Sequence, residues 1–290
     1  MTLAHYMELC KFRIGTIIAL TAIIGYMAVA ETVDPVTVVL LALAMVLGSA
    51  SSSVFNHLYD RDIDRLMKRT ARRPLVSAGA ADQRRALLFA VALMVAGVGL
   101  AALALNWVVA AHLFLGGFTY AVVYTVWLKR RTWWNIVVGG AAGSFAVLAG
   151  AAAVDPTLWL LPLLMAVTLF LWTPSHFWAL ALLLRDDYRA AGVPMLPAVA
   201  GPRRSAEAIV INTVLLVASA ALPWLLGQLG LLYGLVSLGA GALFLSETVR
   251  LMRAPEDRTQ ARRVFFGSMV YLMGVFLAVL LDRHLPMLWT

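Results

Sequence analysis

Apolar stretches long enough to cross a membrane recur along the whole of this 290-residue chain, and they limit its fold more than any other feature. Each runs for about 18 to 22 residues, the length that a helix needs to span the hydrocarbon core of a bilayer. Every backbone polar group must be paired inside that core, and strand alternation is absent, so the spans are expected to be helices. Soluble helices need a polar face, which these stretches lack. The composition agrees, because 13% of the residues are charged, against about a quarter in soluble domains.

The sequence therefore predicts an all-α polytopic membrane protein, a bundle of nine transmembrane helices in a single domain over residues 1–290. No linker rich in Pro, Gly or Ser divides the chain, and its one cysteine, Cys10, excludes an internal disulfide and a multi-cysteine metal site. A cleavable signal peptide is not expected at the N-terminus. The nine spans are expected near residues 14–31, 36–56, 86–105, 107–128, 133–153, 157–181, 206–227, 230–249 and 264–281.

These spans divide the basic residues very unevenly between the two sides of the membrane. Of the 23 Lys and Arg residues, only Arg283 falls on the side of the C-terminus. Because basic loops stay in the cytoplasm, we expect a multi-pass membrane protein with a cytoplasmic N-terminus and the C-terminus outside. The net charge of +8 follows mostly from this topology and needs no nucleic-acid partner.

The stretch N-H-L-Y-D-R-D-I-D places Asn56, Asp60 and Asp64 four residues apart at the end of the second span. If the helix continues, their side chains stack on one face, and Asp62 points away as an ion-pair partner for nearby arginines. An amide and two carboxylates offer the hard oxygen ligands that suit Mg²⁺ together with substrate phosphates. The alternative is a solvated helix end. Asp60 and Asp64 would repel each other by a few tenths of a kcal/mol at this spacing, and a cation between them would relieve that repulsion.

Basic residues follow this acidic face and recur after the fourth span, on the same side of the membrane. Each alone is most simply a topology signal. Together with a metal site they could neutralise a leaving diphosphate. A diphosphate at the mouth of an apolar bundle implies an apolar tail inside it, so the pattern favours a prenyl diphosphate as substrate. The residues concerned are Arg65, Lys68, Arg69, Arg72, Arg73, Lys129, Arg130 and Arg131.

The run N-H-L-Y-D-R-D-I-D-R-L-M-K-R-T-A-R-R-P-L resembles the N-x-x-x-D-x-x-x-D motif of the UbiA-type intramembrane prenyltransferase superfamily. Its continuation, D-R-D-I-D-x-x-M-x-R-T-x-x-R-P-L, is similar to the protohaem IX farnesyltransferase (haem O synthase) family. Further stretches agree at 124–132, 135–140, 172–182 and 186–197. The sequence departs from the pattern of the superfamily in three places. It has no second D-x-x-x-D motif, which fits the haem branch. The usual Pro-Pro of the fifth span is missing, and Ser175 stands where the family tends to have proline.

The resemblance implies an Mg²⁺-dependent enzyme that transfers the farnesyl group of farnesyl diphosphate to a vinyl group of haem B and makes haem O in the lipid bilayer. Haem A synthase or the terminal oxidase machinery is a possible partner by family analogy alone. The residues that it implies for catalysis are Asp60, Asp64, Lys129, Arg130, Asp187 and Tyr188. Those implied for diphosphate or haem binding are Asn56, Lys11, Arg69, Arg73, Tyr124 and His176. Those implied for Mg²⁺ are Asn56, Asp60, Asp64 and Asp187.

Three alternatives stay open at this point. His176 lies inside a span, where ionisable residues are expensive, and it either contacts substrate or makes an ordinary hydrogen bond between helices. An aromatic or quinone-precursor prenyltransferase of the same fold is the second candidate function. A membrane transporter is the third, but it would place ionisable residues near the midpoints of spans, whereas most charges here lie at span ends.

Overall fold

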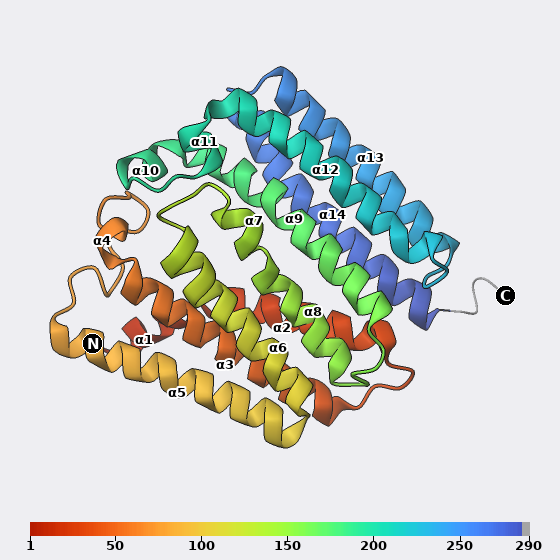
Figure 1. Cartoon of the computed structure of the whole chain (residues 1–290), viewed down its shortest axis with the longest axis horizontal. Helices are drawn as coiled ribbons and strands as arrows, with labels where there is room; N and C mark the ends of the chain where they lie inside the picture. Colours follow the sequence, from red (N-terminus) through yellow and green to blue (C-terminus); the bar gives the residue numbers. More distant parts are fainter. Residues whose placement is uncertain (286–290) are drawn as a thin grey trace.

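The computed structural model describes residues 1–285, and within that range it contains helices and no strands (Figure 1). Within residues 1–285, nine helical segments are long and apolar enough to cross a membrane, which confirms the number predicted. They are α2 (Phe12–Val29), α3 (Pro35–Tyr59), α5 (Ala80–Ala104), α6 (Trp107–Phe118) continued by the π-helix η1 (Thr119–Leu128), α7 (Asn135–Gly139) continued by α8 (Ala141–Ala152), α9 (Leu160–Leu183), α12 (Gly201–Leu225), α13 (Leu231–Arg253) and α14 (Arg258–His284).

Several of these helices extend further at the basic end of the bundle than their apolar stretches predict. Helices α5, α12 and α14 begin several residues earlier than expected, and α13 ends later. The added turns carry charged residues that are good helix formers and pair along the helix, as Arg203 does with Glu207 at 3.4 Å and Arg85 with Asp82 at 3.5 Å. Hydropathy marks where a helix leaves the hydrocarbon and does not mark where it ends.

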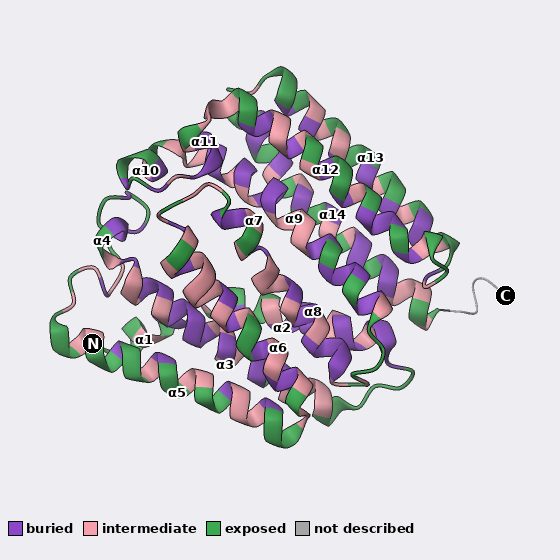
Figure 2. Cartoon of the chain, viewed as in Figure 1, coloured by how far each residue is buried: buried purple, intermediate pink, exposed green. Residues whose placement is uncertain are grey.

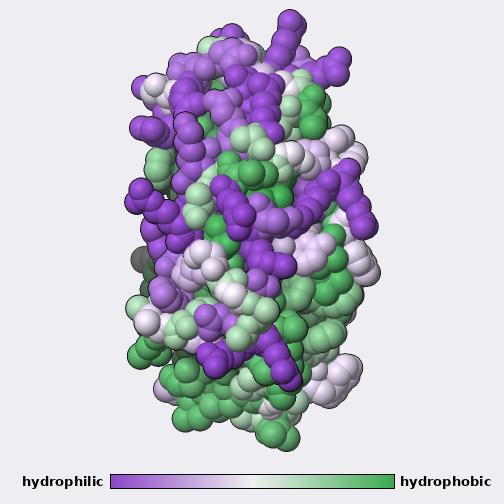
Figure 3. All heavy atoms as spheres, turned by 90° about the vertical axis from the view of Figure 1, so that its left-hand side faces the viewer, coloured by the Kyte–Doolittle hydropathy of each residue, from purple (hydrophilic) through white to green (hydrophobic). Residues whose placement is uncertain are grey.

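Four short helices gather at the end of the bundle where α3 and α9 finish. They are α1 (Leu3–Cys10), α4 (Arg61–Asp64), α10 (Arg185–Ala190) and α11 (Leu196–Val199). Hydrophilic residues gather on this side of the molecule, which Figure 3 views directly. A small cluster of buried apolar residues joins α4, α10 and α11 to α7 and α9, and it includes Ile63, Met67, Ile136 and Tyr188. The loops at this end are therefore packed together.

Of two larger clusters of buried residues, one lies mainly among α2, α3, α6 and α8 and the other mainly among α9, α12, α13 and α14. A further small cluster packs α1 against α3 and α5. In Figure 2 the buried residues lie along the sides of helices that face other helices. Helices α2 and α8 cross so closely that a Cβ at Gly25 would overlap the carbonyl of Val147, and one at Gly150 would overlap the carbonyl of Ala22. Small residues at the crossing let the two backbones meet, which is how membrane helices gain packing energy.

Candidate active site

The acidic motif lies at the polar end of the bundle, where α3 gives way to α4. Asp60 caps α3 with φ −88° and ψ 3°. The amide of Asp60 still donates to the carbonyl of Asn56 at 2.9 Å, and the amide of Asp64 donates to the carbonyl of Asp60 at 2.8 Å. The four-residue spacing therefore survives the break between the helices. Asn56, Asp60 and Asp64 are all buried, and both carboxylates are at most 1% exposed.

Each of the two carboxylates has a cation of its own. Lys129, which follows η1, forms an ion pair with Asp60 in which both side chains are buried. Arg73, from the loop after α4, lies 2.7 Å from Asp64. A buried charge without a partner would be very costly, so these pairs hold the motif in place. Lys129 and Arg73 thus relieve the repulsion between Asp60 and Asp64 in this structure. A cation bound between the two carboxylates stays a prediction.

One oxygen of each carboxylate accepts no hydrogen bond, and this observation bears on a metal. Oδ1 of Asp60 and Oδ1 of Asp64 are buried and have no hydrogen-bond partner. Asn56 lies beside them, because its Nδ2 donates to Oδ2 of Asp60 at 2.6 Å. Buried oxygens without donors are unusual in folded proteins and suit a hard cation. The two carboxylate oxygens therefore fit Mg²⁺, whereas the amide oxygen of Asn56 contacts Lys11 in this structure.

Asp187 does not join Asp60 and Asp64 in a ready-made group of metal ligands among residues 1–285. Asp187 is half-buried on α10, and among the described residues no group of three or more His, Cys, Asp or Glu side chains could hold a metal ion. Its neighbour Tyr188 is buried, and its hydroxyl accepts a hydrogen bond from Arg69 at 3.5 Å. The Arg69 guanidinium also lies 5.8 Å from the Tyr188 ring centroid. Metal ligation by Asp187 stays a prediction, whereas Tyr188 and Arg69 do meet.

Arg130 links Asp62 to the acid pair. Its two terminal nitrogens bond both oxygens of Asp62 at 2.6 and 2.7 Å, as expected for the residue that points away from the acidic face. This guanidinium holds the pKa of the exposed Asp62 carboxyl below its usual range. Arg130 also donates to the carbonyl of Tyr59 at 2.9 Å and lies 3.6 Å from Oδ1 of Asp60. The loop after η1 is thereby tied to the end of α3.

Lys11 enters the same site from the junction between α1 and α2. It has a left-handed backbone with φ 45°, and within residues 1–285 it is the only residue other than glycine with a positive φ. Such a conformation is costly and is held here by the surrounding structure. Its Nζ lies 3.4 Å from Oδ1 of Asn56. Burial, together with the nearby cations Arg73 and Lys129, lowers the pKa of Lys11 to about 7.

The π-helix η1 directs the side chain of Lys129 towards the acidic motif. The amide of Lys129 donates to the carbonyl of Tyr124, five residues earlier, at 2.8 Å, and Oγ1 of Thr125 bonds the carbonyl of Tyr120 at 2.8 Å. The wider turn changes the direction of the residues that follow it, and such segments often occur at functional sites. Thr125 is fully buried and receives a hydrogen bond from Asn56 at 3.3 Å.

Three buried polar residues that the sequence reasoning missed position this site. Besides Thr125, Asn135 donates to the carbonyl of Lys129 at 3.3 Å, and Thr70 bonds the carbonyl of Asp64 at 2.9 Å. All three are at most 1% exposed. Polar residues close to apolar spans were the available signal, although nothing in the sequence tells which backbone group each one meets.

Two stacked aromatic side chains, called here the aromatic wall, lie beside the ion pairs. The rings of Tyr120 and Tyr124 stack with centroids 5.5 Å apart, and the ammonium of Lys129 lies 5.8 Å from the Tyr124 ring. Gly139, near the junction of α7 and α8, leaves room for this wall, because a Cβ there would come within 2.8 Å of the Tyr124 ring. The site thus combines cations, buried oxygens and the faces of aromatic rings.

His176 lies on α9 and contacts residues of α14 as well as of its own helix. Its Nδ1 is 2.8 Å from the hydroxyl of Ser268, and its ring stacks between Trp172 and Phe265 with centroids 4.3 and 4.6 Å away. His176 therefore makes an ordinary hydrogen bond between helices, which is one of the two roles expected for it. A contact between His176 and substrate stays a prediction.

The chain is similar to known proteins over most of its length. The family model described as the UbiA prenyltransferase family matches residues 18–270. Protoheme IX farnesyltransferase 1 of Paramagnetospirillum magneticum is 61% identical over 284 residues, which cover 98% of this chain and 100% of the relative. Among solved structures, that of a digeranylgeranylglyceryl phosphate synthase has a TM-score of 0.78 at 22% identity over 97% of this chain and 98% of its own. A UbiA homologue from Archaeoglobus fulgidus bound to GPP and Mg²⁺ has a TM-score of 0.69 at 18% identity, and the match covers 95% of this chain and 99% of the homologue.

Proposed function

Because this chain belongs to the UbiA prenyltransferase family and is therefore an enzyme that transfers a prenyl group, we propose that it transfers the farnesyl group of farnesyl diphosphate to a vinyl group of haem B. The products are haem O and diphosphate. Two observations support this proposal. The full-length relative at 61% identity carries the name protoheme IX farnesyltransferase, and the polar end of the bundle holds two buried carboxylates among several cations.

The cations of the site would receive the diphosphate. Lys129 and Arg73 now pair with the carboxylates, while Arg69, Arg130 and Lys11 stand around them. Guanidinium and ammonium groups bind phosphate oxygens by charge-assisted hydrogen bonds, so these side chains can stabilise the negative charge that develops on the leaving group. Asn56 would hold Mg²⁺ together with Oδ1 of Asp60 and Oδ1 of Asp64, which accept no hydrogen bond, and Asp187 is a further candidate ligand. Bound Mg²⁺ supplies additional neutralisation of the diphosphate.

The transfer begins when the bond between the farnesyl C1 and the diphosphate oxygen breaks and the diphosphate leaves with the electron pair. The vinyl electrons of haem B then form a carbon–carbon bond to the farnesyl cation. Water adds its oxygen to the cation left beside the porphyrin and loses a proton, which gives the hydroxyethylfarnesyl side chain. The stacked rings of Tyr120 and Tyr124 offer π faces to the allylic cation, and the apolar bundle keeps water from it until the bond has formed.

We place the site on the cytoplasmic side of the bacterial cell (inner) membrane, with the N-terminus on that side and the C-terminus outside, in a single domain. The support is the uneven distribution of Lys and Arg, of which only Arg283 lies at the opposite end. The diphosphate would then enter from the cytoplasm while the farnesyl chain lies among the helices.

The experiment that tests the function uses the purified protein in detergent with haem B, farnesyl diphosphate and Mg²⁺. Haem O, identified by mass spectrometry, is the expected product. Unchanged haem B together with prenylated 4-hydroxybenzoate in a parallel reaction would instead assign the protein to the quinone-precursor branch of the family. A digeranylgeranylglyceryl-type product is not expected, because the structural likeness to that synthase extends to the fold alone.

A further inference from the structure

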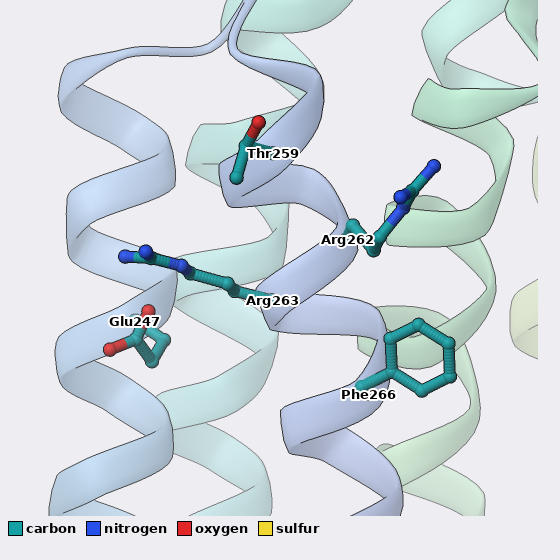
Figure 4. A pocket seen from close by; sticks show the side chains of 5 residues that line it. All are labelled: Glu247, Thr259, Arg262, Arg263 and Phe266. Atoms are coloured by element: carbon teal, nitrogen blue, oxygen red, sulfur yellow. The ribbon is translucent and has the colours of Figure 1, made fainter.

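A groove of about 470 Å³ lies between α13 and α14, away from the acidic motif (Figure 4). Glu247, Thr259, Arg262, Arg263 and Phe266 line it. The groove lies at the same end of the bundle as the candidate active site, because the neighbouring Arg258 donates to the carbonyl of Leu183 at 2.9 Å, where α9 ends and leads into α10.

The groove carries positive charge that its own acidic residue does not neutralise. Glu247 is already engaged, since one of its oxygens pairs with Arg250 and the other accepts a hydrogen bond from Gln260 at 2.7 Å. Arg262 and Arg263 are exposed, and within residues 1–285 neither lies within ion-pair distance of a carboxylate. In Figure 4 Arg263 extends from α14 towards α13 above Glu247, while Arg262 and Phe266 lie on the other flank.

An apolar track leads away from these two arginines along α14. Phe266, Val270, Met273 and Leu277 follow Arg262 at intervals of three or four residues, so they share one face of the helix. They are 55%, 71%, 71% and 55% exposed. Exposed apolar side chains on a membrane-spanning helix face the hydrocarbon chains of lipids. The groove therefore has a cationic head end and an apolar track running into the membrane.

We propose that this groove binds an anionic phospholipid. The phosphate lies between Arg262 and Arg263, the hydroxyl of Thr259 donates to a phosphate oxygen, and one acyl chain follows Phe266, Val270 and Met273. A soluble anion would leave the apolar track without a partner. A zwitterionic lipid would bring its own cation beside two arginines, and Glu247 is not free to receive that cation. The surplus positive charge thus selects a lipid with a net negative head.

Native mass spectrometry of the delipidated full-length protein in detergent tests this proposal, with dioleoylphosphatidylglycerol and dioleoylphosphatidylcholine as probes. We expect one phosphatidylglycerol to bind in preference to phosphatidylcholine. In the Arg262→Gln/Arg263→Gln variant its affinity should fall roughly tenfold or more, because each basic residue near the surface contributes about 1 kcal/mol. Arg262→Lys/Arg263→Lys should retain most of the binding. Arg203→Gln/Arg204→Gln is the matched control, since it removes the same charge from exposed residues near the start of α12 and should bind as the unaltered protein does.

Three outcomes would overturn the proposal. The first is equal binding of the two lipids. The second is unchanged phosphatidylglycerol binding in the Arg262→Gln/Arg263→Gln variant when circular dichroism shows that this variant is folded. The third is displacement of the bound lipid by farnesyl diphosphate, which would make the groove a second site for the substrate.

Discussion

Lys129, which follows the π-helix η1, forms a buried ion pair with Asp60, which follows α3. The two residues are 69 positions apart in the sequence, and each comes directly after a membrane-spanning helix. The pair joins the segment that carries the acidic motif to the segment that carries the basic loop. Both the stability of this end of the bundle and its chemistry therefore depend on it.

Replacing Lys129 by methionine should leave the Asp60 carboxylate buried without its closest partner. Breaking one side of a buried pair costs about 3–5 kcal/mol, so we expect a markedly lower midpoint of thermal unfolding in detergent and loss of haem O formation. The double variant Asp60→Asn/Lys129→Met removes both charges and should recover most of the thermal stability without recovering activity. A Lys129→Met protein as stable as the unaltered one would contradict the pairing.

Substituting Asp64 by asparagine should remove a ligand of the proposed Mg²⁺ while leaving Arg73 a neutral acceptor. We expect the rate of haem O formation to fall by roughly 100-fold or more, because a group that neutralises the leaving diphosphate is lost. The measurement is the initial rate as a function of Mg²⁺ concentration. Glu31→Gln, an exposed acid in the loop before α3, is the control and should keep its rate. Full activity of the unaltered enzyme in excess EDTA would refute the metal assignment.

Thr125→Val should separate positioning from chemistry, since valine keeps the shape of the side chain and removes the hydroxyl that bonds Asn56. The lost hydrogen bond is worth about 1–3 kcal/mol when it leaves a buried group unsatisfied. We therefore expect the Mg²⁺ concentration for half-maximal activity to rise several-fold in Thr125→Val. Thr125→Ser retains the hydroxyl and should restore the original value. If both variants shift equally, the hydroxyl is not what orients Asn56.

Tyr124→Leu should slow the reaction by removing an aromatic face beside the proposed cation, while Tyr124→Phe keeps that face. Cation–π stabilisation of about 1–2 kcal/mol in a desolvated site corresponds to a roughly 5- to 30-fold lower rate for the leucine variant. Single-turnover kinetics of haem O formation is the appropriate measurement, because it separates chemistry from product release. Equal rates for the two variants would exclude the ring from transition-state stabilisation.

Gly150→Ala tests the crossing of α2 and α8. The added Cβ would overlap the carbonyl of Ala22, so the helices must move apart, and we expect aggregation or a clearly lower unfolding temperature. Gly99→Ala on α5 is the matched control, because a Cβ there meets nothing within 4 Å. That change should be neutral or stabilising by up to about 1 kcal/mol, since alanine favours helix more than glycine does.

Much of the architecture was predictable from local sequence properties. Run length and hydropathy predicted nine spans, because a bilayer imposes its thickness on each helix separately. The four-residue spacing of Asn56, Asp60 and Asp64 predicted that they would share one face, and it also predicted that Asp62 would pair with an arginine, as it does with Arg130. The spans and the shared face depend on neighbours within a few turns of the chain, so one sequence was enough to read them. The particular partner of Asp62 does not, because Arg130 is 68 residues away.

The tertiary structure alone decided which side chains meet. The sequence contains many basic residues near the motif, yet Asp60 pairs with Lys129 and Asp64 with Arg73. The residues of η1 give no recognisable sequence signal for the wide turn that directs Lys129. Such contacts depend on how helices distant in the sequence cross and rotate. The packing of the whole bundle sets those angles, so no local pattern contains them.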